Sequence, residues 1–295
     1  MTAKIIDGKA IADRLRAEYR LRVDDLKSSH GVTPALAVIL VGDNPASRSY
    51  VRGKIAGCKQ VGIRSELIEL PVSVTEGELL ARIRTLNEDP AIHGILVQLP
   101  LPPHIRVASV VEQISVEKDV DGFHLYNMGG LVTGNTVFSP CTPYGVQKIL
   151  EIEQIPVEGR NVVVVGASNL VGKPTALMLM QQEATVSICH IKTRDLGQFT
   201  LLADILVVAA GVPNLIVPQM VRTGAVVIDV GFNRLPDGRI VGDVDFERVK
   251  EKASYITPVP GGVGQMTVTM LLHNTILSAE RVARAVVSPF RRVCG

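Results

Sequence analysis

Short apolar runs alternate with stretches of helical periodicity along most of the chain. In the first half, an apolar run stops at Gly42, as a buried strand does, and Thr75 with Glu78 forms a capping box that predicts a helix start. The predicted strands are residues 36–41, 67–70 and 94–99, and the predicted helices include residues 8–28, 47–54 and 75–87. This βαβ order predicts an α/β protein with a largely parallel sheet covered by helices.

A second βα series follows a stretch rich in Gly, Pro, Thr and Asn at residues 129–144, which we interpret as a boundary or hinge. A helix is predicted at about 143–153, and a long last helix is expected to pack back on the first domain. The predicted strands are residues 161–166, 185–189, 205–209, 225–230 and 254–256. We therefore expect one domain at 1–140, completed by 266–287, and a Rossmann-like parallel-sheet domain at 141–265. Residues 288–295 are expected to be loosely ordered.

Composition narrows the class of protein. The 295 residues suffice for two domains, and 46% hydrophobic residues without Trp fit an aliphatic α/β core. The net charge is +2 and only Arg291-Arg292 stands out as a basic run, so nucleic acid is not indicated as a partner. No apolar run is long enough to cross a bilayer and the N-terminus lacks a signal-peptide core, so we expect a cytoplasmic protein without membrane contact.

Cysteine and histidine spacing gives no sign of a metal site or a redox dithiol. The four cysteines are scattered, and the six histidines show no metal-ligand spacing. Reduced thiols and no metal are therefore expected. The cysteines are Cys58, Cys141, Cys189 and Cys294.

Residues 47–54 offer the first candidate chemistry. They belong to a helix opened at Asp43, Asn44 and Pro45, with a capping side chain followed by Pro in the first turn. Tyr50 and Lys54 are four residues apart, so they share one helix face. An aromatic ring beside an amine suits a planar substrate that gains or loses a proton. The alternative is a surface Tyr beside a solvated Lys.

Three further places carry candidate substrate residues. Gln98 lies at the carboxyl end of its strand, the binding edge of an α/β sheet, where it can face an amine or simply cap the strand. Asp121 precedes Gly122 in a turn, where its carboxylate can bind an amino-pyrimidine edge by paired hydrogen bonds or merely shape the turn. The prolines and glycines of residues 258–264 predict a fixed backbone wall against a ligand.

The stretch from Gly166 to Gly172 follows an apolar strand and enters a helix. Glycine at the strand end lets the backbone approach a phosphate, and the helix start supplies free N–H groups and the positive end of the dipole. Ser168 stands where the usual G-x-G-x-x-G has its second glycine, so a structural turn without a ligand is the alternative. Strands that end near Gly211 and Gly231 support a dinucleotide crevice.

The end of the second strand of this series favours NADP over NAD. NAD enzymes usually place an acidic residue there to bind the ribose hydroxyls. Here Lys192 and Arg194 occur before the first acid, Asp195, and two cations favour a 2′-phosphate. The alternative is that both cations are only solvated and that the enzyme uses NAD.

Six ordered segments recur together in one known family. They are residues 47–54, 97–102, 119–123, 140–145, the Gly166 loop, and residues 258–264. On these motifs the chain resembles the bifunctional methylenetetrahydrofolate dehydrogenase/methenyltetrahydrofolate cyclohydrolase (FolD) family, over nearly its whole length.

The resemblance implies a two-domain protomer with an active cleft between the domains, usually a homodimer. Residues 1–140 would bind folate and residues 141–265 would bind NADP. The implied activity oxidises 5,10-methylenetetrahydrofolate and hydrolyses the methenyl product to 10-formyltetrahydrofolate, in one-carbon metabolism. Tyr50 would stack on the folate, Lys54 would be catalytic, Gln98 would tune Lys54, and Asp121 would bind the pterin.

The implied contacts extend beyond these four residues. Substrate contacts would be Tyr50, Lys54, Val97, Gln98, Leu99, Asp121, Pro260, Gly261 and Gly262. Cofactor contacts would be Gly166, Ala167, Ser168, Ile191, Lys192, Arg194, Gly211, Gly231 and Phe232.

The two steps require different chemistry. Hydride transfer to nicotinamide leaves a resonance-stabilised cation, so positioning dominates and no general base is needed. Hydrolysis requires proton transfers to and from the reacting groups. A free lysine, with a pKa of about 10.4, is mostly protonated at neutral pH, but desolvation and a cationic substrate lower that pKa. Lys54 is therefore the predicted general acid and base of the hydrolytic step.

Three positions depart from the family pattern or vary within it. Family members generally have Pro where this chain has Gln265, and its loss would loosen the turn beside the folate. Ala167 replaces an arginine that some members use for the NADP phosphate, and Ile191 is apolar. The alternatives are a dehydrogenase with weak or absent cyclohydrolase activity or an NAD preference, and a non-catalytic folate or nucleotide sensor.

Overall fold

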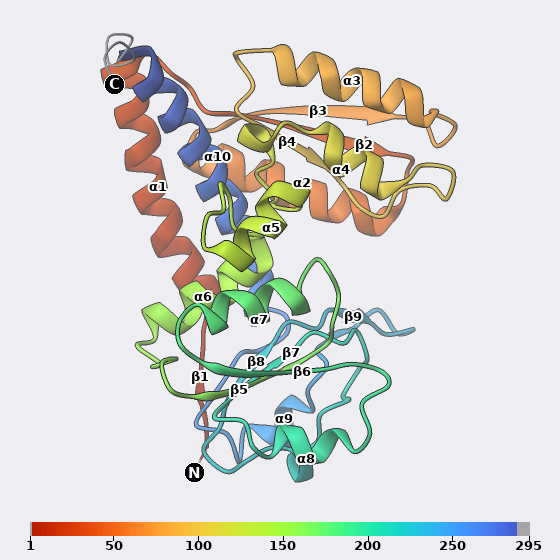
Figure 1. Ribbon diagram of the computed structural model, residues 1–295, viewed down its shortest axis with the longest axis vertical. Helices are drawn as coiled ribbons and strands as arrows, with labels where there is room; N and C mark the ends of the chain where they lie inside the picture. Colours follow the sequence, from red (N-terminus) through yellow and green to blue (C-terminus); the bar gives the residue numbers. More distant parts are fainter. Residues whose placement is uncertain (1, 288–295) are drawn as a thin grey trace. The chain divides into compact units, whose positions relative to one another are not determined.

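A computed structural model describes residues 2–287, which divide into two compact units (Figure 1). Among the described residues, unit 1 contains residues 2–13 and 140–267, and unit 2 contains residues 14–139 and 268–287. Two long helices, α1 (Gly8–His30) and α10 (Val263–Val287), each contribute residues to both units. Residues 288–295, including Cys294, lie outside the described residues, so their predicted loose order is not addressed.

Unit 2 is built on a parallel three-stranded sheet in the order β3-β2-β4. The strands are β2 (Ala35–Val41), β3 (Arg64–Leu70) and β4 (Gly94–Val97), joined through α2 (Pro45–Val61) and α3 (Glu76–Glu88). The chain steps from β2 to β3 in one direction and returns past β2 to β4. Right-handed crossovers then place α2 and α3 on opposite faces of the sheet, as Figure 1 shows.

The capping box predicted for α3 is present. The Thr75 hydroxyl accepts the N–H of Glu78 at 3.2 Å, and the Glu78 carboxylate accepts the N–H of Thr75 at 2.8 Å. Below this helix a core of aliphatic side chains forms from alternate residues of β2 together with Leu79, Ile83 and Leu86. The local start signal and the apolar stripe therefore agree on the same helix.

Unit 2 also contains α4 (Val107–Gln113), the 3₁₀ turn η1 (Val116–Lys118) and α5 (Leu125–Thr133). The stretch at residues 129–144 that we interpreted as a boundary or hinge begins inside a helix, because residues 129–133 belong to α5. The His124 ring accepts the N–H of Tyr126 at the start of α5, and Gly134 ends it with a φ of 76°. Gly130 lies so close to the backbone of Asn135 that a Cβ would be 2.8 Å from its oxygen, so the chain that turns back just after the helix requires glycine here.

Within unit 2, α10 packs against α1 and α2. The rings of Tyr19 and His273 lie 5.5 Å apart, and Arg22 forms a salt bridge with Glu280 at 2.9 Å. At Gly57 of α2, a Cβ would be 3.1 Å from Val268, so the helices approach closely there. These contacts hold the last helix to the first half of the chain.

Unit 1 contains a six-stranded parallel sheet in the order β1-β11-β8-β7-β5-β6. Its strands are β1 (Lys4–Ile5), β5 (Asn161–Val165), β6 (Thr185–Cys189), β7 (Ile205–Val208), β8 (Val226–Asp229) and β11 (Tyr255–Ile256). The order reverses beside β5, which creates a switch point at the carboxyl ends of β5 and β7. The predicted boundaries place the N-terminal residues in the first domain, but β1 pairs with β11, with Lys4 opposite Tyr255.

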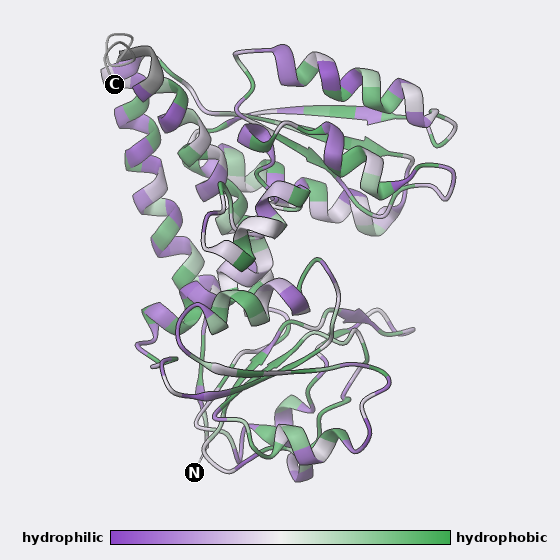
Figure 2. Ribbon diagram, in the orientation of Figure 1, coloured by the Kyte–Doolittle hydropathy of each residue, from purple (hydrophilic) through white to green (hydrophobic). Residues whose placement is uncertain are grey.

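Helices cover both faces of this sheet. Figure 1 shows α6 (Cys141–Ile152) and α7 (Gly172–Met180) on one face, and α8 (Leu196–Thr200) and α9 (Phe246–Val249) on the other. The hydrophobic colouring of the central strands in Figure 2 agrees with burial on both sides. The 3₁₀ turn η2 (Pro218–Met220) and a small hairpin of β9 (Asn233–Arg234) and β10 (Ile240–Val241) complete the unit.

Candidate active site

The helix that carries Tyr50 and Lys54 begins where the sequence predicts. The Asn44 side chain accepts the N–H groups of Ala46 at 2.9 Å and Ser47 at 3.2 Å, ahead of the first turn of α2. Tyr50 is 45% exposed, and Lys54 is half-buried. The aromatic ring is therefore accessible to a planar ligand, whereas the amine lies deeper.

Lys54 and Gln98 meet, although they are 44 residues apart. The Lys54 ammonium donates to Gln98 Oε1 at 3.0 Å. The Gln98 side-chain NH₂ donates to the carbonyl of Leu99 at 2.7 Å, and its backbone N–H donates to Ile39 in the neighbouring strand. Because the amide nitrogen is already engaged, the amide oxygen is the atom turned toward the lysine. The strand end therefore fixes the position of the amine.

Ser47 was not among the predicted site residues. It lies seven residues before Lys54 on the same side of α2, and its hydroxyl is buried without a hydrogen-bond partner among the described residues. A buried polar group is normally paired, so an unpaired hydroxyl beside this face is consistent with a bound ligand. Its place in the motif of residues 47–54 was the available signal.

Two aspartates of the 119–123 turn have different surroundings. Asp119 is buried, and its carboxylate accepts the N–H of His124 and the Asn127 side chain, each at 2.8 Å. Burial raises the pKa of Asp119 above its ordinary value. Asp121 is half-buried, and within the described chain no hydrogen bond joins it to Lys54 or Gln98. Asp119 thus supports the turn, and Asp121 is the carboxylate that the turn presents.

The predicted backbone wall at residues 258–264 belongs to unit 1. A Cβ at Gly262 would lie 2.6 Å from the carbonyl oxygen of Pro258, and the N–H of Lys9 donates to Gly261 at 3.1 Å. The segment is therefore held closely by its own unit. Unit 1 contains Pro260, Gly261 and Gly262, whereas the other predicted substrate residues belong to unit 2. The cleft between the domains therefore stays a prediction.

The Gly166 loop is a tight turn between β5 and α7. Gly166 has a φ of 119°, and a Cβ there would lie 2.1 Å from the carbonyl oxygen of Ala209. The prediction of free N–H groups at the helix start is wrong in part. The Ser168 hydroxyl accepts the N–H groups of Val171 and Gly172, at 3.1 and 3.4 Å. The Ser168 carbonyl accepts the N–H of Lys173. The serine in place of the second glycine therefore caps α7.

The rest of this sheet edge fits a dinucleotide. Ile191 is 96% exposed after the edge strand β6, and Phe232 is 45% exposed after the buried strand β8, so apolar surface is available to ring systems. Lys192 and Arg194 are exposed and form no salt bridge within the described chain, so both remain available to a phosphate. Because Gly166 has no side chain, the carbonyl of Ala209 can lie close to it, as described above.

Two buried aspartates at this edge were missed by sequence analysis. Asp229 ends β8 and Asp243 follows β10, and both are buried. Burial raises the pKa of Asp229 to about 7, against the lowering effect of backbone N–H donors. For Asp229 the available signal was its place at the end of an apolar strand, before Val230 and Gly231; the local sequence around Asp243 gave none.

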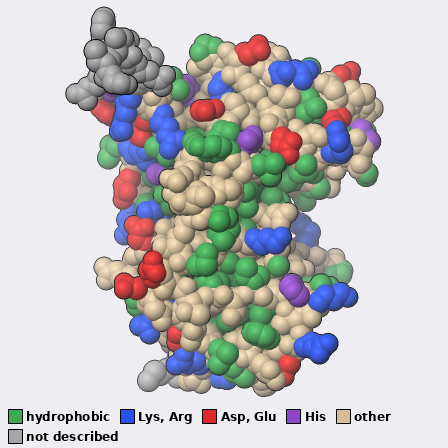
Figure 3. All heavy atoms as spheres, viewed as in Figure 1, with side chains coloured by type: hydrophobic (Ala, Val, Ile, Leu, Met, Phe, Trp, Pro, Cys, Tyr) green, Lys and Arg blue, Asp and Glu red, His purple; other side chains and the backbone are tan. Residues whose placement is uncertain are grey.

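Other chemistries have little support. Burial raises the pKa of the Cys58 thiol to about 12, and Cys141 and Cys189 are also buried and in no disulfide with another described cysteine. Among residues 2–287 no group of His, Cys, Asp and Glu side chains is arranged to hold a metal ion. The helices of the described chain include none that is both long and apolar enough to span a bilayer. Figure 3 shows basic side chains interspersed with acidic ones on the face in view.

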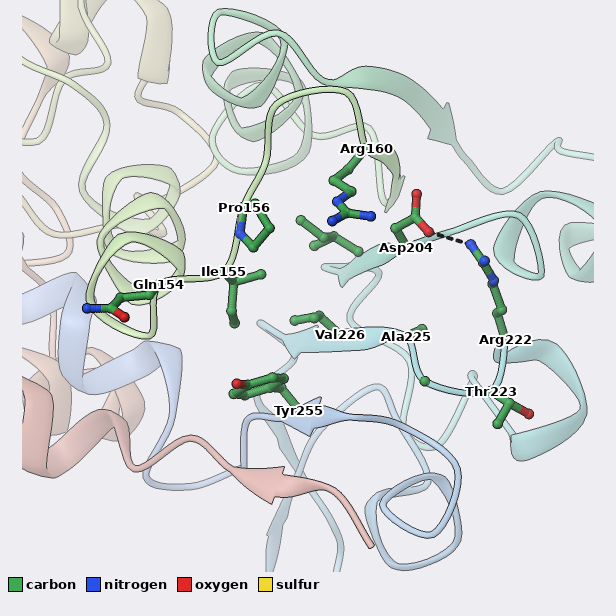
Figure 4. Close-up of a pocket in the computed structure, with 12 residues that line it drawn as sticks. Gln154, Ile155, Pro156, Arg160, Asp204, Arg222, Thr223, Ala225, Val226 and Tyr255 are labelled. Carbon is green, nitrogen blue, oxygen red and sulfur yellow. Dashed lines mark hydrogen bonds and ion pairs between the residues drawn. The ribbon is translucent and has the colours of Figure 1, made fainter. Parts of the chain in front are cut away.

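A cavity of about 270 Å³ lies at the opposite edge of the unit 1 sheet, at the amino ends of the strands (Figure 4). It contains none of the predicted site residues. Asp204 and Arg222 form an ion pair in it, and Arg160 and Tyr255 line it. Ligands of parallel α/β sheets bind at the carboxyl ends of strands, so this cavity is not the candidate active site.

Comparison with known proteins agrees with this geometry. The family model for the tetrahydrofolate dehydrogenase/cyclohydrolase catalytic domain matches residues 6–121, and the one for the NAD(P)-binding domain matches residues 140–283. The chain is 59% identical over 281 residues to the bifunctional protein FolD of Nitrosospira multiformis, which covers 95% of this chain and 97% of that protein.

Solved structures give the same result. The bifunctional FolD dehydrogenase/cyclohydrolase of Campylobacter jejuni is 53% identical with a TM-score of 0.93, covering 95% of this chain and 99% of that one. The FolD of Trypanosoma brucei, solved with NADP cofactor and inhibitor, is 38% identical with a TM-score of 0.93, covering 97% and 100%.

The fold and the matched domains define a two-domain α/β enzyme that uses a nicotinamide dinucleotide. The chain belongs to the tetrahydrofolate dehydrogenase/cyclohydrolase family. The predicted family, the two-domain α/β class and the Rossmann-like sheet are confirmed. The roles of individual site residues stay predictions.

Proposed function

We propose that this protein oxidises 5,10-methylenetetrahydrofolate with NADP and hydrolyses the methenyl product to 10-formyltetrahydrofolate. The observation that carries this proposal is the Lys54–Gln98 pair, which places a held amine beside the accessible ring of Tyr50 in a chain of this family. Its family membership supplies both activities, and Lys192 and Arg194 support NADP rather than NAD.

The dehydrogenase step needs orientation more than proton transfer. When bound, NADP supplies the acceptor for the hydride of the methylene carbon. The Gly166 turn, Ser168, Ile191 and Phe232 would hold the dinucleotide, with Lys192 and Arg194 toward its 2′-phosphate. Tyr50 would stack on the folate and Asp121 would bind the amino-pyrimidine edge. These residues fix the distance between donor and acceptor carbons.

The hydrolytic step needs a base and then an acid. Water adds its oxygen to the methenyl carbon, and Lys54 acts as the general base that accepts the proton released by the water. The bond from that carbon to one ring nitrogen then breaks. Lys54 returns the proton to the departing nitrogen, and the proton of the added hydroxyl leaves to solvent as the formyl C=O forms. Gln98 keeps the amine at the reacting carbon through its 3.0 Å hydrogen bond. In the net reaction the methenyl cation gains the oxygen and one hydrogen of the water, and the other hydrogen is released as a proton.

Separate assays of the two steps test this function. Purified protein with methylenetetrahydrofolate and NADP is expected to produce reduced nicotinamide, more efficiently than with NAD. Protein with methenyltetrahydrofolate alone is expected to accelerate its hydrolysis. Reduction without hydrolysis would favour a dehydrogenase lacking the second activity, and neither reaction would favour a folate or nucleotide sensor.

The finer assignments accompany this proposal. We expect a cytoplasmic homodimer that binds tetrahydrofolate derivatives, with neither nucleic acid nor membrane as a partner. Light scattering during size-exclusion chromatography measures the oligomeric state. A mass near the monomer value of 31.7 kDa would contradict the homodimer.

A further inference from the structure

Two loops at the carboxyl edge of the unit 1 sheet share one buried anchor. We name residues 209–212 the β7 loop and residues 230–233 the β8 loop, after the strands that precede them. The Asp243 carboxylate accepts three consecutive N–H groups of the β7 loop: Ala210 at 2.6 Å, Gly211 at 2.8 Å and Val212 at 3.0 Å. A single side chain therefore sets the path of the whole β7 loop.

The same carboxylate reaches the β8 loop. The Asn233 side-chain NH₂ donates to Asp243 Oδ1 at 2.8 Å. Asp229 makes the second connection, because its carboxylate accepts the N–H groups of Gly231, Asp243 and Val244 at 2.9, 3.0 and 2.9 Å. The two aspartates thus tie the β7 loop to the β8 loop through hydrogen bonds alone.

Glycines at two positions show how closely the carboxylates approach. A Cβ at Gly231 would lie 2.3 Å from Asp243 Oδ1, and one at Gly242 would lie 1.9 Å from Asp229 Oδ2. Any side chain at either position would displace a carboxylate. The glycine of the β8 loop is therefore required by the anchor as well as by any ligand.

Burial of these two carboxylates is unfavourable for the free energy of folding, and uncharged side chains would avoid this cost. Asp243 is 0% exposed and Asp229 is 3% exposed, and within the described chain neither forms a salt bridge with a cation. Burying a carboxylate without a cation is unfavourable unless hydrogen bonds replace its water. Here N–H donors from both loops do so.

We propose that Asp243 is a positioning residue for the nicotinamide dinucleotide. Its carboxylate holds the β7 and β8 loops in the one conformation that presents Gly211, Gly231 and Phe232 to the cofactor. This inference rests on the proposed function, because those three positions are cofactor contacts only by family resemblance. Asp243 itself lies beneath the loops and acts through them.

Asp243→Asn tests the proposal while nearly preserving the volume of the side chain. The amide retains one acceptor oxygen and turns an NH₂ toward N–H donors, so the loops lose part of their anchor. The dissociation constant for NADPH, measured by its fluorescence on titration, is expected to rise about tenfold or more. The cyclohydrolase rate with methenyltetrahydrofolate, which needs no dinucleotide, is expected to remain at the parent value.

Asp204→Asn is the matched control at the other edge of the same sheet. The Asp204 carboxylate accepts the N–H of Asn161 at 2.9 Å and pairs with Arg222 (Figure 4). Asp204 precedes the amino end of β7, whereas both loops follow carboxyl ends of strands. This variant is expected to bind NADPH like the parent protein. If it weakens NADPH binding as much as Asp243→Asn does, a general loss of sheet structure explains both and the positioning role is wrong.

Asn233→Ala keeps the test decisive if Asp243→Asn does not fold, as judged by loss of the cyclohydrolase rate. It removes the Asn233 hydrogen bond to Asp243, together with a 3.4 Å one to the Val241 carbonyl, and leaves the three hydrogen bonds that Asp243 accepts from the β7 loop. A severalfold weaker NADPH affinity supports the proposal, and parent affinity overturns it. Failure of the parent protein to bind NADPH or reduce NADP contradicts the proposed function instead.

Discussion

The two units contribute different groups to the proposed reaction: unit 2 contributes side chains, and unit 1 contributes backbone. In unit 2 the sheet presents side chains, since Lys54 from α2 and Gln98 from the end of β4 meet at 3.0 Å. In unit 1 the sheet presents backbone, since Gly166 turns at a φ of 119° against Ala209 without room for a Cβ. Proton transfer needs a particular functional group, whereas binding of a dinucleotide needs close approach of the backbone to its phosphates. Substitutions should therefore separate the two activities.

Removal of the amine gives the largest expected effect. Lys54→Ala leaves no group to accept and return the proton, so the cyclohydrolase rate is expected to fall about 10²–10⁴-fold. NADPH affinity is expected to stay at the parent value, because no residue of unit 1 changes. The measurements are the decay of methenyltetrahydrofolate absorbance and an NADPH titration.

Gln98→Leu provides a graded control for that prediction. It keeps the amine but removes the acceptor that positions it, so we expect a loss of about tenfold in cyclohydrolase rate. Parent hydrolysis by Lys54→Ala would show that another group transfers the proton. A loss equal in the two variants would show that Gln98 does more than orient the lysine.

Gly166→Ala tests the backbone half of the comparison. The added Cβ would collide with the Ala209 carbonyl, and the alanine would have to adopt an unfavourable φ. The turn must therefore move. NADPH affinity is expected to fall about 10-fold to 100-fold, with cyclohydrolase activity retained. Gly159→Ala is the control, because Gly159 has a φ of 69° but open space around it. Equal losses in both variants would assign the effect to backbone conformation alone.

Local signals explain most of what the sequence predicts correctly. The cap at Asn44, the capping box at Thr75 and the strand ends depend on residues within one or two turns of each other. The Lys54–Gln98 pairing was predicted from the family resemblance, and the structure places the two side chains in contact. Pattern alone could not have set that distance, because the two residues come from separate elements.

Two of the features that were missed depend on distant partners. The strand β1 has two residues and forms only by pairing with β11, about 250 positions later in the chain. Helix α5 was missed for a local reason, because it contains two residues of low helix propensity, Gly129 and Gly130. Asp243 binds N–H groups more than 30 residues before it. A single sequence gives no indication of such pairings.

Asp229 predicts a pH dependence confined to unit 1. The folded state holds the Asp229 proton to a pH of about 7, whereas its ordinary pKa is 3.8. Between these values the folded state binds more protons than the unfolded state, so the contribution to the free energy of unfolding decreases as pH rises. That contribution changes by at most about 1.4 kcal/mol per pH unit and levels off above the folded pKa.

Asp229→Asn removes this titration. The difference in free energy of unfolding between parent and variant, measured by denaturant titration, should shift across that pH window and be constant above it. Carboxyl NMR would give the pKa of Asp229 directly. A value near 4 would contradict the prediction, and the stability difference would then not vary over the window.

The smallest expected effect concerns Gln265, in the first turn of α10. The backbone N–H of Gln265 donates to the carbonyl of Gly262 at 3.2 Å, so this residue adds a hydrogen bond to the 258–264 segment that proline cannot form. The expectation that loss of the family's proline loosens this turn is therefore opposed by a contact that the glutamine supplies. Proline would restrict φ and also restrict Gly264 before it, so the gain and the loss nearly cancel.

We expect Gln265→Pro to change the free energy of unfolding by no more than about 1 kcal/mol, and both activities by less than any variant above. Gln265→Ala separates the causes, because it removes the side chain but keeps the N–H. If both variants raise the Michaelis constant for methenyltetrahydrofolate equally, the glutamine side chain is responsible. If only Gln265→Pro does so, the hydrogen bond to Gly262 shapes the wall, and unit 1 contributes backbone to the folate as well as to the dinucleotide.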